Sequence, residues 1–185
     1  AQPMASEDAR LIVTFNGEIY NFKEIKFELE RKGHHFHTHS DTEVILHAYR
    51  EWGEACVERF NGMFAFALYD QSTQSLWLVR DRLGVKPLYY AQVSDGSVIF
   101  GSELKVLLAH PLLRREPSLT AIEDYLALGY VPDDACIVAG VRKLGAGMHL
   151  KLVRGRGLPE PQTYWDVSFA DRSKAKAPEL IEELT

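Results

Sequence analysis

The sequence contains no long apolar run and no excess of basic charge, and both absences restrict its function. The longest uninterrupted apolar stretch covers only residues 63–69, whereas a helix that crosses a bilayer needs about 20 residues. Acidic residues outnumber basic residues by 26 to 21, which gives a net charge of −5, whereas nucleic-acid-binding surfaces are usually basic. The composition therefore predicts no membrane-spanning segment and no nucleic-acid partner.

Cysteine is also scarce. The chain has two cysteines, Cys56 and Cys136, which form neither a paired disulfide framework nor a metal-binding motif. This usage is typical of a reducing compartment, and the sequence shows no basic and apolar leader resembling a signal peptide. We therefore expect a cytoplasmic protein. Residues 1–10 are typical of a loop that runs into a strand, so we expect the natural N-terminus to lie upstream.

The first part of the chain predicts a strand followed by a helix. A hydrophobic content of 46% and a charged content of 25% are ordinary for a globular domain. A β-rich run over residues 11–15 leads into Asn16-Gly17, a common turn dipeptide. An amphipathic pattern then predicts a helix over residues 21–32, with Asn21 as its N-cap.

A second helix is predicted over residues 41–52, where apolar residues recur at i, i+4 spacing. Ser40 and Glu43 fit a capping box, with Ser40 as the N-cap and Glu43 three residues later. Asp41 falls in the first turn, where a carboxylate interacts favourably with the helix dipole. The helix start is therefore explained without any ligand.

The spacing of apolar residues changes after residue 62, and from there the sequence predicts mainly strands. Helices outside two packed antiparallel sheets would give an α+β fold, a four-layer α/β/β/α sandwich. Near-continuous apolarity in the first two runs indicates sheets that are covered on both faces. The predicted strands cover residues 63–70, 75–80, 88–92 and 97–101 as consecutive antiparallel strands, with a further β pattern over 142–153. The predicted helices cover residues 103–109, 119–129 and 178–184.

Histidines and cysteines offer candidate sites that the sequence does not complete. His35, His37 and His39 would lie on one face if this segment formed a strand. No cysteine or acidic cluster completes a ligand set, so a solvated edge strand is the favoured interpretation and no metal site is predicted. Cys56 lies in an apolar helical stripe with Phe60, which indicates a buried core residue and not a nucleophile.

Two segments carry the most specific signal. Residues 15–21 have the sequence Phe-Asn-Gly-Glu-Ile-Tyr-Asn, and residues 40–44 have the sequence Ser-Asp-Thr-Glu-Val. Together they resemble the glutamine pocket of the class II, N-terminal-nucleophile amidotransferases, specifically the glutaminase domain of asparagine synthetases. The resemblance covers residues 1–167, as a glutaminase domain that lacks its N-terminal segment and is therefore incomplete. Residues 168–185 would be a linker and the start of a synthetase domain.

The resemblance implies a role for individual residues. Thiolate attack on an amide produces a tetrahedral oxyanion, which needs fixed hydrogen-bond donors. The side-chain amide of Asn16 and the backbone N–H of Gly17 would supply them. Glu18 would line the glutamine pocket, Asp41 would receive the α-ammonium group of glutamine, and Met63 would face the ammonia route. Purely structural interpretations stay open beside these: a turn for Asn16-Gly17, a helix cap for Asp41 and a core position for Met63.

The family nucleophile is an N-terminal cysteine, and this chain begins at Ala1, so we expect the chain alone to be inactive. The parent protein would hydrolyse glutamine and pass ammonia to its own downstream synthetase domain, which converts aspartate to asparagine and uses ATP and Mg²⁺. No cofactor is expected in the glutaminase domain, and a homodimer is an expected assembly. Two alternatives stay open. One is an amidotransferase acting on another carboxylate, of the kind associated with exopolysaccharide or exosortase systems. The other is an inactive scaffold domain.

Overall fold

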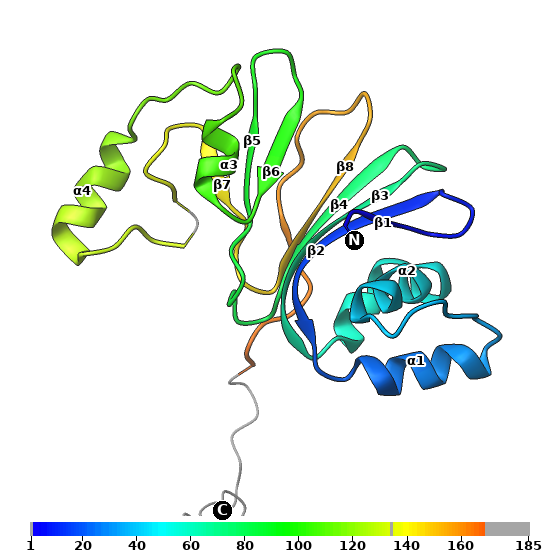
Figure 1. Ribbon diagram of the computed structural model, residues 1–185. Coiled ribbons are helices and arrows are strands. Elements are labelled where there is room, and N and C mark those ends of the chain that lie inside the picture. Colours follow the sequence, from blue (N-terminus) through cyan, green and yellow to red (C-terminus); the bar gives the residue numbers. More distant parts are fainter. Residues whose placement is uncertain (1, 134, 169–185) are drawn as a thin grey trace, which may run out of the picture.

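The computed structural model describes residues 2–133 and 135–168, which form two antiparallel sheets with helices on their outer faces (Figure 1). The larger sheet has the order β1-β2-β3-β4-β8-β9, and the smaller sheet has the order β6-β5-β7. The strands are β1 (Met4–Ala5), β2 (Leu11–Ile19), β3 (Gly62–Asp70), β4 (Ser75–Arg80), β5 (Tyr89–Gln92), β6 (Val98–Gly101), β7 (Val141–Lys143), β8 (Met148–Val153) and β9 (Gln162–Thr163). The helices are α1 (Phe22–Arg31), α2 (Asp41–Trp52), the 3₁₀ helix η1 (Gly53–Arg59), α3 (Leu104–Leu108) and α4 (Leu119–Leu128). The helix predicted over residues 178–184 lies outside the described residues.

Three apolar clusters separate the four layers and confirm the α/β/β/α sandwich (Figure 1). The first packs α1 and α2 against one face of the large sheet and includes Ile45 and Phe66. The second lies between the two sheets and includes Leu78 of β4 and Tyr90 of β5. The third packs α3, through Leu107, against the small sheet. Strands β3 and β4 contribute side chains to the first two clusters, so both of their faces are covered, as their apolar sequences predicted.

The four consecutive strands after residue 62 do not form one meander. β3 pairs with β4 and β5 pairs with β6, but the second neighbour of β4 is β8, and β5 belongs to the other sheet. The β pattern over residues 142–153 is likewise two strands, β7 in the small sheet and β8 in the large one. Gly147 N donates to Asp81 O (2.9 Å) where the chain returns to the large sheet. The small sheet is therefore an excursion between β4 and β8.

The N-caps of the first two helices differ from each other. Ser40 Oγ accepts a hydrogen bond from Thr42 N (3.2 Å), which confirms Ser40 as the N-cap of α2. Asn21 occupies the N-cap position of α1, as predicted, but its side chain makes no capping hydrogen bond to the helix. Its side chain instead donates to Arg59 O (3.0 Å) and accepts from Asn61 N (2.9 Å). The segment that leads into β3 lies beside Asn21 and takes the hydrogen bonds that a cap would have used.

The capping box at α2 is only half formed, because Glu43 faces the preceding loop. Its carboxylate accepts hydrogen bonds from His37 N (2.8 Å), Thr38 N (2.7 Å) and Thr38 Oγ1. These backbone groups have no sheet partner, since residues 34–40 form neither helix nor strand. The predicted edge strand carrying His35, His37 and His39 is therefore wrong. The buried Glu43 carboxylate accepts the hydrogen bonds from backbone N–H groups that a neighbouring strand would otherwise accept.

The two cysteines are both buried, with exposed fractions of 0% for Cys56 and 7% for Cys136. Burial raises the pKa of the Cys56 thiol, which disfavours the reactive thiolate. Cys56 is therefore a core residue, as predicted. In the part of the chain that the structure describes, no helix has both the length and the apolar character that crossing a membrane requires.

Candidate functional site

The candidate site forms where the end of β2 meets the start of α2. Ile19 N donates a hydrogen bond to Asp41 Oδ2 (3.1 Å), so the first residue of α2 is tied to the backbone beside Glu18. The Ser40 cap fixes the start of the helix and thereby the position of this carboxylate. The two segments that carry the sequence signal, residues 15–21 and 40–44, are thus brought together by a direct contact.

Asn16 and Gly17 do not form a turn, and this corrects the sequence prediction. Strand β2 continues through them to Ile19, with Asn16 opposite Ala65 and Gly17 opposite Phe64 of β3. A Cβ atom on Gly17 would lie 2.1 Å from Met63 O, and Gly17 has φ +152°. Glycine is therefore required for close approach of the two strands and not for a reversal of the chain.

Gly62 completes the same close approach from the other strand. A Cβ atom on Gly62 would lie 2.1 Å from Glu18 O. The strand end is further held by Tyr20 N, which donates to Asn61 O (2.7 Å). Sequence reasoning missed Gly62 and Asn61 as elements of the site. The Asn61-Gly62 dipeptide at the start of β3 can be recognised in the sequence, but only the pairing register shows that Gly62 lies opposite Ile19.

Asn16, Glu18 and Met63 lie on one face of the large sheet. Residues i and i+2 of a strand share a face, and Glu18 lies directly opposite Met63. The opposite face of β2 carries Phe15 and Ile19, which are buried against the helices. The Asn16 and Glu18 side chains are exposed, and within residues 2–133 and 135–168 neither makes a hydrogen bond or ion pair. An amide donor and a carboxylate are therefore free to meet a ligand at this strand end.

Asp81, the residue after β4, supports the site through its contact with β3 although it does not line the site. Its fully buried carboxylate accepts a hydrogen bond from Phe64 N (3.1 Å), and Phe64 is the residue opposite Gly17. The same carboxylate accepts from Leu83, Val85 and Lys86 N at 3.1, 3.0 and 2.9 Å. Residues 81–86 thus form a bend around this carboxylate, and Phe64 N joins the bend to the strand paired with Gly17.

The described residues give no sign of a metal centre. Across residues 2–133 and 135–168, no three histidine, cysteine, aspartate or glutamate side chains gather in a way that would hold a metal ion. What the site offers is an amide donor, two carboxylates and closely paired backbone. Carboxylates can accept hydrogen bonds from an ammonium group, and an amide donor can polarise a carbonyl group.

Comparison with known proteins agrees with this geometry. The family described as the glutamine amidotransferase domain matches residues 1–165. Asparagine synthetase [glutamine-hydrolyzing] 3 of Bacillus subtilis is 44% identical over 130 residues, which are 69% of this chain and 21% of that protein. Asparagine synthetase [glutamine-hydrolyzing] 1 of the same organism is 38% identical over 168 residues, which are 91% of this chain and 26% of that protein. The chain thus spans about a fifth to a quarter of these relatives.

Solved structures show the same fold at low sequence identity. Glutamine phosphoribosylpyrophosphate amidotransferase from B. subtilis matches with a TM-score of 0.58 and 21% identity, over 89% of this chain and 32% of that chain. The allosteric regulatory enzyme of purine biosynthesis matches with a TM-score of 0.60 and 20% identity, over 89% and 31%. The fold is that of the N-terminal-nucleophile amidotransferases. The chain belongs to the glutamine amidotransferase domain family, and it is of the type found in asparagine synthetases.

Proposed function

We propose that residues 1–167 bind glutamine at the β2–α2 junction and take part in its hydrolysis to glutamate and ammonia. The observation that carries this proposal is the hydrogen bond from Ile19 N to Asp41 Oδ2, which joins the two signature segments. Asp41 would receive the α-ammonium group, and Glu18 would line the same pocket. Asn16 and Gly17 would donate hydrogen bonds to the oxyanion that forms when the side-chain amide is attacked.

The nucleophile in this proposal comes from outside the 185 residues. Cys56 and Cys136 are both buried and cannot reach a substrate at the β2–α2 junction. A thiolate supplied upstream would attack the amide carbon and form a tetrahedral intermediate. Transfer to the amide nitrogen of the proton lost by the thiol would let the intermediate collapse to ammonia and a thioester, and water would then hydrolyse the thioester to glutamate and the free thiol. Side chains and backbone donors suffice for these steps, so the proposal assigns no cofactor to this domain.

The ammonia would leave along the face that carries Met63, toward a synthetase domain whose start, after a linker, lies within residues 168–185. The relatives are named as glutamine-hydrolysing asparagine synthetases, which supports aspartate as the acceptor. ATP and Mg²⁺ would act in that second domain. Two cysteines with no disulfide between them support a reducing, cytoplasmic location for the whole protein, and we propose a homodimer as its assembly.

Replacement of Asp41 by asparagine should weaken glutamine binding strongly. Asp41→Asn keeps the size of the side chain and an oxygen that can accept from Ile19 N, but it removes the charge that would pair with the α-ammonium group. Loss of one charge-assisted hydrogen bond is expected to cost about 1.5–3 kcal/mol, roughly 10- to 150-fold in KM. The measurement is steady-state glutaminase kinetics of the longer protein that carries the cysteine nucleophile.

Ser40→Ala is the matched control for the helix start. It removes the hydrogen bond from Thr42 N, and it should cost about 1 kcal/mol of stability with little change in KM. Equal KM values for wild type and Asp41→Asn would mean that Asp41 only supports the helix. A glutaminase-inactive longer protein that still binds glutamine would instead point to a binding scaffold.

A further inference from the structure

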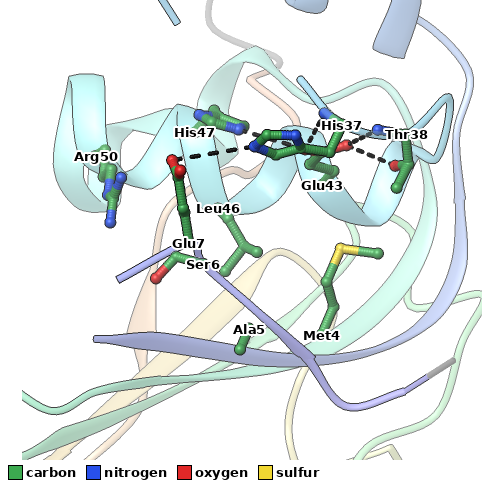
Figure 2. Close-up of a pocket in the computed structure, with 10 residues that line it drawn as sticks. All are labelled: Met4, Ala5, Ser6, Glu7, His37, Thr38, Glu43, Leu46, His47 and Arg50. Carbon is green, nitrogen blue, oxygen red and sulfur yellow. Dashed lines mark hydrogen bonds and ion pairs between the residues drawn. The ribbon is translucent and has the colours of Figure 1, made fainter. Parts of the chain in front are cut away.

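A second pocket lies away from the candidate glutamine site (Figure 2). It has a volume of about 190 Å³ and is formed by β1 with the turn after it, the loop before α2, and α2 itself. Asn16, Gly17, Glu18 and Asp41 do not contribute to its lining. At about 30 Å³ for each water-sized group, the pocket has room for a ligand of roughly six non-hydrogen atoms.

The floor of this pocket is apolar. Figure 2 shows Met4 and Ala5 of β1 on one side and Leu46 of α2 beside them. Leu46 is 3% exposed and belongs to the first apolar cluster, so it is fixed in place. A short hydrocarbon chain would be desolvated here, at about 0.8 kcal/mol for each buried methylene group.

The inner wall of the pocket contains Glu43, and one oxygen of its carboxylate can accept a further hydrogen bond. Glu43 Oε1 accepts a single hydrogen bond, from His37 N, while Oε2 accepts two from Thr38. A carboxylate oxygen can accept two hydrogen bonds. Burial alone would raise the pKa of Glu43, but the hydrogen bonds from His37 and Thr38 lower it below its usual value, so this side chain is ionised at neutral pH.

His47 presents a basic nitrogen to the same wall, because a chain of hydrogen bonds selects its tautomer. Hydrogen bonds from His34 and Lys32 lower the pKa of Glu51, so Glu51 is an anionic acceptor. His34 Nε2 therefore carries the proton in its contact with Glu51 Oε2 (3.0 Å). A neutral His34 with its proton on Nε2 then accepts at Nδ1 from His47 Nδ1 (3.2 Å). In neutral His47 this leaves Nε2 with a lone pair.

His47 stays neutral near pH 7, which keeps that lone pair available. Burial lowers the pKa of His47, and this effect outweighs the opposing effect of the nearby Glu43 carboxylate. His47 Nε2 lies 3.7 Å from Glu43 Oε1, too far for a direct hydrogen bond. Two acceptors therefore face the pocket side by side, and the residues that line it place no donor between them. One ligand nitrogen with two N–H groups could satisfy both.

The charges around the pocket favour a cation. Glu43 and Glu7 are both carboxylates that line it, and His37 Nε2 lies 4.0 Å from Glu7 Oε2 at the outer edge. The one fully cationic residue in the lining, Arg50, is paired with Asp8. An anionic ligand would meet two carboxylates there, whereas an ammonium group would meet paired acceptors.

We propose that this pocket binds a small primary amine with a short apolar chain. Its ammonium group would donate to His47 Nε2 and Glu43 Oε1, and its hydrocarbon chain would lie on Leu46 and Met4. The ligand would join β1, the loop before α2 and α2 itself, and α2 is the helix that begins at Asp41. The pocket would thus be an amine site separate from the glutamine site, and it does not depend on the function proposed above.

The test is a titration of the 185-residue protein with n-butylamine, followed by backbone amide NMR shifts at constant pH 7.5 and constant ionic strength. n-Butanol and butyrate have chains of similar length and serve as the uncharged and anionic controls. We expect saturable shifts at residues that line the pocket, with a Kd of about 1–10 mM for so small a ligand. n-Butanol and butyrate should bind at least about tenfold more weakly, because neither supplies the charged donor.

Two variants locate the site. Ala5→Leu fills the pocket from an exposed strand position, and His47→Phe removes the acceptor while keeping a ring. Each substitution should raise the Kd of n-butylamine at least about tenfold, and circular dichroism and Tm should show that each variant is folded. Glu28→Gln removes a carboxylate that pairs with Arg59 outside the pocket, and it should leave Kd unchanged. Equal responses to n-butylamine and n-butanol, shifts spread over the surface, or an unchanged Kd in folded Ala5→Leu would overturn the proposal.

Discussion

Replacement of Asn16 by alanine should lower kcat for glutamine hydrolysis by roughly 10²–10³ and leave KM nearly unchanged, in the longer protein that carries the nucleophile. The reason is that an oxyanion donor acts mainly in the transition state. The Asn16 side chain is exposed and makes no hydrogen bond or ion pair with any described residue, so its loss should barely affect the fold. Steady-state kinetics with glutamine, alongside a thermal melt, would measure both effects.

Thr14→Ala provides the control for this experiment. Thr14 lies two residues earlier on the same exposed face of β2, opposite Ala67. Its replacement should leave kcat and KM close to wild type. A rise in KM with unchanged kcat in Asn16→Ala would instead identify Asn16 as a ground-state contact. A large loss of stability would identify it as a structural residue of the strand.

Replacement of Asp81 by alanine should destabilise the domain by about 3–5 kcal/mol, which is large for a single substitution. The carboxylate is 0% exposed and accepts hydrogen bonds from four backbone N–H groups. Alanine would leave these groups without an acceptor, and an unpaired buried donor costs about 1–3 kcal/mol. The four losses are not additive, because the bend can relax toward water. Urea unfolding followed by circular dichroism would measure the change.

Asp95→Ala is the matched control, since Asp95 is an exposed turn aspartate that accepts one hydrogen bond, from Ser97 N (2.9 Å). It should cost no more than about 1 kcal/mol. Asp81→Asn should fall between the two, because an amide keeps one acceptor oxygen and places an N–H₂ group toward other donors. A loss below about 1 kcal/mol in Asp81→Ala would show that the bend is held mainly by its backbone.

The sequence predicted helices and strands correctly where neighbouring residues determine them. The second helix and its Ser40 cap depend on neighbouring residues only, and both predictions are confirmed. The turn at Asn16-Gly17 failed because local preference favours a reversal, whereas pairing with β3 continues the strand. The glycine that permits this pairing, Gly62, lies far along the chain. No local pattern could have supplied that information.

In the candidate site too, local motifs identified some residues, whereas contacts between distant segments were not predicted. Asp41 and Glu18 were identified from their motifs, and the structure brings their segments into contact through Ile19 N. The support given by Asp81 to Phe64 was not predicted, because it joins a bend after β4 to a residue of β3 that is distant in the sequence. The division of the later strands between two sheets also depends on a long-range pairing, that of β4 with β8.

The return of the chain at Gly147, beside Asp81, has a consequence for how this domain can vary in length. Residues 81–147 begin and end at one point on the large sheet, where Gly147 N donates to Asp81 O. The entropy cost of closing such a segment grows only slowly with its length. Insertions or deletions in the exposed connections of the small sheet, such as residues 94–96, should therefore leave the register of β4 with β8 unchanged. Related chains can accordingly differ in length within this segment while they keep the same strand end at Asn16 and Gly17.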